Sequence, residues 1–198
     1  MNRNRNLIKM LGIAIAIGST SPLLSSFVPS AFSPRAEAQT QVDGNVLFNR
    51  GVQKLQQQDY QGAISDFSTL IEREPQNANA YLGRAIAYRN QQNYPKALED
   101  YNQSLQLNPT NANAYLGRGI AKRRTQDDRG AIEDYTNALR YNENYAQAYY
   151  NRALSKAQLG DREGALADFR KAAELYRNQE LTQYYQDALA RIAELEAR

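Results

Sequence analysis

The stretch Asn-Ala-Asn-Ala-Tyr-Leu-Gly-Arg occurs twice in this chain, at residues 77–84 and again, 34 residues later, at residues 111–118. A period of this size is the feature that most constrains the fold, because self-similarity at roughly 20–50 residues marks an array of stacked structural repeats. From about Gly44 onward the chain aligns with itself at this period. Any fold must therefore place the same kind of surface at the same position of each unit.

Four columns of similar residues stay in register over four units. Two columns hold small residues and two hold mostly aromatic residues. The columns are Gly51, Ala85, Gly119 and Ala153; Ala63, Ala97, Ala131 and Ala165; Phe67, Tyr101, Tyr135 and Phe169; and Leu47, Tyr81, Tyr115 and Tyr149. Small residues allow two helices to approach closely, and the rings fill the space beside that contact.

Each unit carries two apolar patterns at helical spacing, separated by a polar break. Pro95 lies where a second helix should begin, a position at which its missing N–H costs nothing. Pro75 and Pro109 follow predicted second helices and stop them. The sequence therefore predicts four helix pairs, which occupy residues 44–77, 78–111, 112–145 and 146–179.

This pattern resembles the tetratricopeptide repeat (TPR), a 34-residue helix–turn–helix unit with small, small, aromatic and proline positions in this order. The resemblance implies an all-α solenoid, wound as a right-handed superhelix, with the first helices on its concave side. The chain departs from the pattern at Glu143 and Arg177, which stand where two earlier units have proline.

The last segment, residues 180–198, reads as a one-sided helix. Its apolar stripe consists of Leu181, Tyr184, Tyr185, Ala188, Leu189, Ile192 and Leu195. A solenoid leaves the apolar face of its final repeat open, and such a helix can cover it. We expect a capping helix here. The alternative is a helix that docks a partner or a second copy.

Residues 1–38 have the order of a secretory signal peptide. A basic start precedes the compact apolar run Leu11–Ile17, and Ala36 and Ala38 supply the small residues before a cleavage site. We expect a mature protein that begins at Gln39, followed by a short linker over residues 39–43. The predicted destination is a bacterial periplasm or cell envelope, or a thylakoid lumen.

The alternative for this leader is a retained anchor, because residues 10–34 carry no charge. Pro22, Pro29 and several serines interrupt that stretch, and its dense apolar part is much shorter than the ~20 residues of a membrane-spanning helix. We therefore expect no stable membrane span once the leader is cleaved.

Composition argues against an enzyme and against a nucleic-acid binder. The chain has no histidine and no cysteine, which removes the usual general base, the thiol nucleophile and the commonest metal ligands. Residues 1–38 hold four of the 24 basic and one of the 21 acidic residues, so the rest has no net charge. We expect no cofactor, no metal and no nucleic acid.

An arginine recurs in each first helix, and an aspartate follows it 16 residues later in each second helix. The pairs are Arg50 and Asp66, Arg84 and Asp100, Arg118 and Asp134, and Arg152 and Asp168. Because both members recur equally strictly, we predict a structural ladder of ion pairs formed by the guanidinium fork. The alternative is an arginine row that binds a ligand.

The concave groove is the predicted binding surface. Its candidate residues form an apolar strip edged by amides and arginines. They are Asn79, Leu82, Ile86, Arg89, Asn90, Asn113, Leu116, Ile120, Arg123, Arg124, Gln147 and Tyr150. Such a lining suits a peptide, whose side chains would enter the strip while amides satisfy its backbone. Packing between neighbouring repeats is the alternative role for the apolar members.

Some TPR domains bind C-terminal carboxylates through a clamp of lysine and asparagine on their first helices. Apolar residues such as Leu82 and Ile86 occupy the comparable places here. The resemblance therefore implies protein binding without that particular clamp.

Two functions follow as hypotheses. The first is an exported, non-enzymatic adaptor or scaffold that holds a protein or peptide segment in its groove. The second is a self-associating assembly factor that acts through its C-terminal helix and edges. A tyrosine-rich stretch with Tyr141, Tyr145 and Tyr150 is either an interface patch or aromatic filling at a repeat junction.

Overall fold

The computed structural model describes residues 43–197, and within this range the chain forms α-helices and no strand. The nine helices of this range are α2 (Gly44–Gln56), α3 (Tyr60–Arg73), α4 (Ala78–Asn90), α5 (Tyr94–Leu107), α6 (Ala112–Arg124), α7 (Asp128–Tyr141), α8 (Ala146–Gln158), α9 (Arg162–Asn178) and α10 (Thr182–Glu196). The expected signal peptide and most of the expected linker lie outside the described residues.

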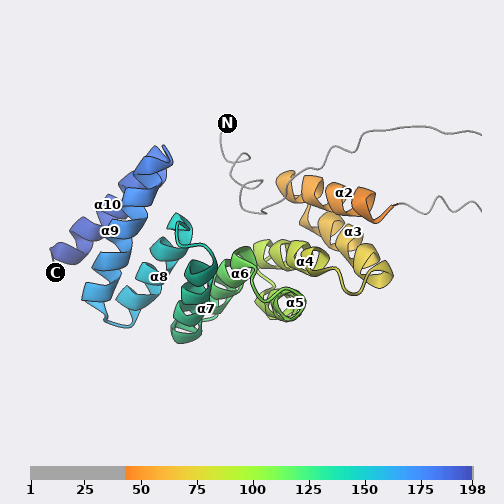
Figure 1. Ribbon diagram of the computed structural model, residues 1–198, viewed down its shortest axis with the longest axis horizontal. Helices are drawn as coiled ribbons and strands as arrows, with labels where there is room; N and C mark the ends of the chain where they lie inside the picture. The colour runs from red at the N-terminus through yellow and green to blue at the C-terminus, as the bar shows by residue number, and fades with distance from the viewer. Residues whose placement is uncertain (1–42, 198) are drawn as a thin grey trace, which may run out of the picture.

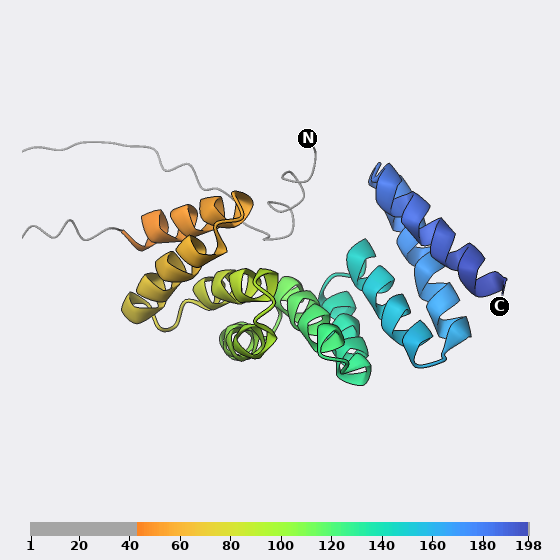
Figure 2. The same cartoon turned by 180° about the vertical axis from the view of Figure 1, so that it is seen from behind.

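The helices form four antiparallel pairs and a final single helix, the architecture of a TPR solenoid. The first helix of each pair begins at Gly44, Ala78, Ala112 or Ala146, at intervals of 34 residues. Successive pairs follow one another along an open bow, with α2 and α3 at one end and α9 and α10 at the other (Figure 1). The reverse view shows the same order, with α10 lying along α9 (Figure 2).

The turn inside each pair is built around a residue with positive φ. Gln58, Gln92 and Gln126 have φ values of 63°, 61° and 66°, and Gly160 completes the series at 85°. Glu180, between α9 and α10, has the same conformation at 58°. The chain therefore turns from α9 into α10 as it turns within a pair, which folds α10 back along α9.

Side-chain caps start most helices. Asp59, Asp127 and Asp161 each accept a hydrogen bond from the amide of a glycine three residues later, at 2.9 Å. Asn77 and Asn111 cap α4 and α6 in the same manner. Tyr145 stands at the corresponding position before α8 and makes no side-chain cap bond there, because a phenol cannot fold back onto the first turn as Asn or Asp does.

The aromatic column forms the core. Phe67, Tyr101, Tyr135 and Phe169 are almost completely buried. A Cβ added at Gly51 or at Gly83 would lie within 3 Å of the Phe67 ring. This ring is therefore wedged between the first helix of its own pair and the first helix of the next pair, which joins neighbouring repeats into one continuous core.

The last helix covers the end of this core. Tyr185 and Ala188 of α10 pack on one apolar cluster of α9, and Ile192 and Leu195 contact a second cluster around Phe169. Within residues 43–197, none of the helices is both long enough and apolar enough to cross a bilayer.

Candidate functional site: a pocket across three repeats

The recurring arginines and aspartates lie against each other in all four repeats. Arg84 donates from Nε and Nη2 to the two carboxylate oxygens of Asp100, at 2.7 and 2.8 Å. Arg50, Arg118 and Arg152 bind Asp66, Asp134 and Asp168 through the same two atoms, at 2.5–3.0 Å. The aspartates are buried, Arg50 is exposed, and the other three arginines are partly exposed. This bidentate geometry is among the strongest that charged side chains form.

Each of three arginines also reaches the preceding repeat. The Nη1 atoms of Arg84, Arg118 and Arg152 donate to Ser68, Asn102 and Thr136, at 3.1, 2.7 and 3.2 Å. These acceptors lie on the second helix of the previous pair. The row therefore ties repeat to repeat, and its guanidinium groups already have protein partners.

A second cation approaches three of the four aspartates. Lys54, Lys122 and Lys156 lie 2.9, 2.9 and 2.8 Å from Asp66, Asp134 and Asp168. Burial raises the pKa of Asp66, but hydrogen bonds and charge from Arg50 and Lys54 outweigh it, and the net effect lowers this pKa. The carboxylate is thus held in its charged form.

A pocket of about 440 Å³ lies across the second, third and fourth repeats, and Leu55 of the first repeat also lines it. We call it the central pocket. Its lining comes mainly from the first helices α4 and α6, with two residues from the second helix α5 and Gln147 from α8. The lining residues are Leu55, Ile86, Arg89, Asn90, Gln92, Tyr94, Tyr101, Asn113, Leu116, Gly117, Ile120, Arg124, Tyr145 and Gln147.

Eight of the twelve candidate groove residues come together in this pocket. They are Ile86, Arg89, Asn90, Asn113, Leu116, Ile120, Arg124 and Gln147. Leu116 has only 4% of its surface exposed, so it forms part of the pocket wall and also packs in the core. The packing role, which was the alternative for the apolar strip, is therefore present at Leu116.

The other four candidates do not line this pocket. Leu82 is 2% exposed and packs in the core of the second repeat. Tyr150 packs its ring on Phe169, with 5.3 Å between centroids. Arg123 lies close enough to Tyr135 for its charge to act on that phenol.

Asn79 is exposed in the first turn of α4, away from the pocket. Leu82, Arg123 and Tyr150 share one physical cause: their side chains turn towards a neighbouring helix, where burial or a partner is available. Asn79 is outside the pocket for another reason: it lies at the N-terminal end of α4, whereas the pocket residues Arg89 and Asn90 lie at the C-terminal end.

Tyrosines are the main contribution that the sequence pattern did not reveal. Tyr101 belongs to the core column, yet it also lines the pocket. Tyr145 occupies the column in which two earlier repeats have a capping asparagine. Its hydroxyl donates instead to Asn113 Oδ1 at 2.6 Å and joins two repeats. The replacement of the capping asparagine by tyrosine at position 145 is the sequence feature that could have indicated this contact.

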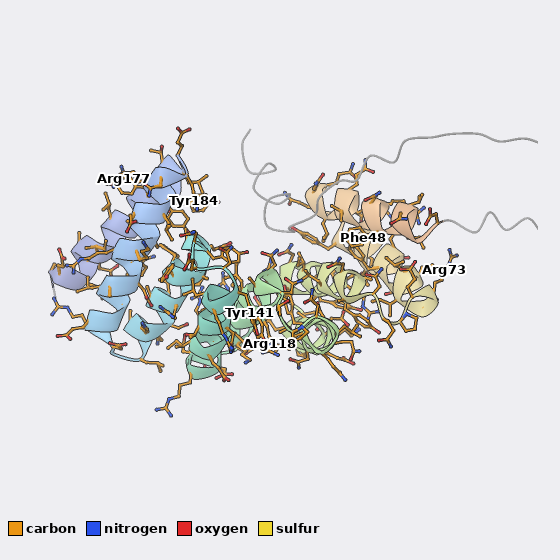
Figure 3. All side chains as sticks on the ribbon, in the orientation of Figure 1. Phe48, Arg73, Arg118, Tyr141, Arg177 and Tyr184 are labelled. Atoms are coloured by element: carbon orange, nitrogen blue, oxygen red, sulfur yellow. The ribbon has the colours of Figure 1, made fainter. Side chains whose placement is uncertain are left out.

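The tyrosines of the tyrosine-rich stretch have different roles: Tyr141 lies at the surface, and Tyr145 and Tyr150 pack inside the molecule. Tyr141 is 40% exposed and stacks on Tyr115, with 5.8 Å between ring centroids. Arg118 lies over the Tyr115 ring, and Figure 3 shows Arg118 and Tyr141 in the same middle part of the bow. Tyr145 and Tyr150 are engaged inside the molecule, so the three do not form one exposed patch.

Two polar atoms of the pocket have no partner in the part of the chain that the structure describes. The Tyr101 hydroxyl and Gln147 Oε1 are buried and form no hydrogen bond with residues 43–197. A Cβ at Gly117 would lie 2.5 Å from the Tyr101 oxygen. Burial raises the pKa of Tyr101 and of Tyr145, so both phenols keep their protons and act as donors.

The charge of the pocket is one-sided. Arg89 and Arg124 line it, while none of the lining residues described is aspartate or glutamate. Within residues 43–197 neither arginine forms an ion pair, in contrast to the four arginines of the ladder. Among the same residues, no group of carboxylates is arranged to hold a metal ion.

Comparisons with known proteins agree on the family. Residues 48–112 and residues 146–179 each match the tetratricopeptide repeat family. A search of curated protein sequences finds no significant match.

Similar solved structures include several TPR proteins. A MamA chain from Desulfovibrio magneticus RS-1 that covers residue 41 to the end is 21% identical with a TM-score of 0.65, over 71% of this chain and 79% of that MamA chain. The thermophilic TPR protein TTC0263 of Thermus thermophilus is 22% identical with a TM-score of 0.64, over 77% of this chain and 84% of its own.

A third similar structure is the first TPR domain of Spaghetti (RPAP3), bound to the HSP90 peptide SRMEEVD. It is 26% identical with a TM-score of 0.58, over 59% of this chain and 93% of its own. Together with the repeat geometry and the family matches, these similarities show that the chain belongs to the tetratricopeptide repeat family.

Proposed function

We propose that the chain is an exported, non-enzymatic adaptor that holds a segment of another protein in the central pocket. TPR repeats serve as protein–protein interaction modules, and this pocket provides what a peptide segment needs. Ile86, Leu116 and Ile120 offer apolar contact, while Asn90, Asn113 and Gln147 offer amides for a peptide backbone. The observation that carries the proposal is the joining of these groups from three repeats in one pocket.

The peptide complex of the similar Spaghetti domain supports this use of the fold. The composition of the whole chain supports a non-enzymatic role, because the chain has neither histidine nor cysteine. The signal-peptide pattern of residues 1–38 supports export to a periplasm, a cell envelope or a thylakoid lumen.

A second candidate function is self-association through α10. Tyr184 and Leu189 are 40% and 38% exposed on this helix. Figure 3 shows Tyr184 at the opposite end of the bow from Phe48. This surface is separate from the central pocket, so experiments can separate the two functions.

In-cell photo-crosslinking tests the adaptor function. A photoreactive phenylalanine at Asn90, a partly exposed pocket residue, should trap one specific foreign protein in cells that express the full chain. Adding Ile120→Glu, which places a charge in the apolar wall, should abolish the capture while the helical circular dichroism spectrum persists.

Glu133 supplies the matched control position, because it is exposed on α7 and does not line the pocket. A photoreactive residue there should not trap the same protein. Equal capture from both positions, or capture that survives Ile120→Glu, would show that the pocket is not the binding surface. Trapping only a second copy of the chain would favour self-association.

A further inference from the structure

The central pocket combines unpaired positive charge with an unused buried hydroxyl. Arg89 and Arg124 enter its lining from α4 and α6, and neither forms an ion pair within residues 43–197. A guanidinium group held at a pocket whose described lining has no carboxylate favours an anion from outside this part of the chain.

Tyr101 lines the same pocket as Arg89 and Arg124. Its hydroxyl is buried beside Gly117, it lacks a partner among the described residues, and the charge of Arg89 acts on it. A phenol that keeps its proton can donate one hydrogen bond to an anionic oxygen. Arg89 Nη2 donates to the amide oxygen of Asn90 over a long 3.4 Å, and this contact leaves the rest of the guanidinium fork open.

The hydroxyl is not needed for packing. The same column contains Phe67 and Phe169, which are buried as completely as Tyr101. A buried hydroxyl without a partner costs free energy in the unbound protein. Tyr135 also has a buried hydroxyl without a partner among the described residues, away from the pocket, so Tyr101 is distinguished by its place in the pocket lining and by the charge of Arg89 that acts on it.

We propose that the central pocket binds a carboxylate of its peptide ligand through Arg89, Arg124 and the Tyr101 hydroxyl. This inference rests on the proposed function and names the chemistry of the segment that is held. The ligand carries an acidic group next to an apolar side chain, because Ile86, Leu116 and Ile120 adjoin the arginines in the same lining. The carboxylate comes from an aspartate or glutamate side chain or from the end of a chain.

The site differs from the lysine–asparagine clamp known in other TPR domains. The comparable first-helix positions carry Leu82 and Ile86 in one repeat and Leu116 and Ile120 in the next. The arginines lie one turn further along their helices, and the hydroxyl comes from a second helix, α5.

Peptide titrations monitored by NMR test the inference. The probes are acetyl-Leu-Glu-Leu-amide, acetyl-Leu-Gln-Leu-amide and acetyl-Leu-Gln-Leu with a free carboxylate, added to the isotope-labelled full chain. The glutamate peptide should bind about tenfold more tightly than the glutamine amide, since a charge-assisted hydrogen bond contributes about 1.5–3 kcal/mol. Equally tight binding of the free-carboxylate peptide would support the inference with the chain end as the source.

Substitutions locate the anion. Arg89→Gln and Arg124→Gln should each remove most of the glutamate preference, whereas Arg129→Gln, on an exposed part of α7, should leave it unchanged. Affinity for the glutamine amide equal to that for both carboxylate-bearing peptides, or no signal change with any of the three peptides, would overturn the inference.

The hydroxyl has its own test. Tyr101→Phe should weaken the glutamate peptide severalfold while the protein remains at least as stable, because Phe already occupies this column. Tyr135→Phe removes the other buried hydroxyl of the column, outside the pocket, and should not change binding. Unchanged affinity in Tyr101→Phe would overturn the part assigned to the hydroxyl.

These results stand apart from the crosslinking experiment. Specific capture at Asn90 without any carboxylate preference would refute this inference and leave the adaptor function in place. Carboxylate binding in solution without a captured protein would refute the adaptor function.

Discussion

Asp134 shows why the arginine row is structural. Its carboxylate is 1% exposed and is held by Arg118 through two bonds and by Lys122 at 2.9 Å. Both cations keep about a fifth of their side-chain surface in water, so they can rehydrate if the anion is lost. The cost of losing it is then that of the charged hydrogen bonds rather than that of two stranded buried charges.

We predict that Asp134→Ala lowers the free energy of unfolding by about 2 kcal/mol, measured by urea denaturation at neutral pH. Glu133→Ala provides a matched control, because it removes the same charge from the adjacent exposed position of α7. It should change stability by no more than about 0.5 kcal/mol. Equal effects of the two substitutions would remove the ion pair as the explanation.

The contribution of the Asp66 ion pairs to the stability of the fold depends on pH. The pKa of this carboxyl in the folded protein lies below its ordinary value of 3.8, because Arg50 and Lys54 outweigh the effect of burial. A depressed pKa contributes stability above the ordinary value, and this contribution is lost as pH falls through the folded-state value.

The stability difference between the natural protein and Asp66→Asn should therefore be constant from pH 7 to about pH 5 and shrink below pH 4. Urea midpoints of both proteins, compared at each pH, cancel the titration of the other carboxylates. A difference that grows as the pH is lowered would contradict the assignment.

At the scale of the helices, glycine sets the spacing between neighbouring pairs. A Cβ at Gly83 of α4 would lie 2.5–2.8 Å from three atoms of the Phe67 ring. The ring is fully buried between two helices, so it has no free space into which it can move. The overlap should outweigh the roughly 1 kcal/mol by which alanine favours a helix over glycine.

Gly83→Ala should therefore destabilise the protein by about 1–2 kcal/mol in thermal or urea unfolding. The double variant with Phe67→Leu tests the cause, since a smaller side chain makes room for the new methyl group. It should be more stable than the sum of the two single effects predicts. Strict additivity would show that the two positions do not interact.

The helices could be predicted from the sequence because the 34-residue period repeats the physical requirement four times. Small residues at Ala85 and Ala97 and a ring at Tyr101 suffice to indicate a close helix pair. The backbone conformation of the turns was harder to predict from the sequence. Positive φ is usually indicated by glycine, but glutamine adopts it here at Gln58, Gln92 and Gln126.

The pocket could be predicted only in part. Residues on the free face of the first helices, such as Ile120 and Arg124, follow from helical periodicity. Tyr101 and Gly117 could not be assigned to it, because the repeat pattern explains them fully as core. A residue that packs in the core and also lines the pocket cannot be recognised from a repeat pattern that reflects only side-chain size.

For the whole molecule, the end of the solenoid decides whether the array is stable alone. Each ring of the core is covered by the next pair, but Phe169 belongs to the last pair and has no successor. Ile192 and Leu195 of α10 supply the missing contact, and the turn at Glu180 directs them onto it. A terminal repeat without such a cover exposes its apolar face to water.

Removal of residues 180–198 should lower the stability of the protein by about 2–4 kcal/mol, because several half-buried apolar side chains leave the surface of α9. The exposed face should also bind a hydrophobic dye and promote aggregation.

Leu189→Glu tests the other face of the same helix, since Leu189 points away from α9 far enough to be 38% exposed. This variant should retain full stability. If light scattering shows an oligomer that Leu189→Glu dissolves while the fold persists, the outer face of α10 is an interface. If only the deletion changes the molecule, α10 acts as a cap.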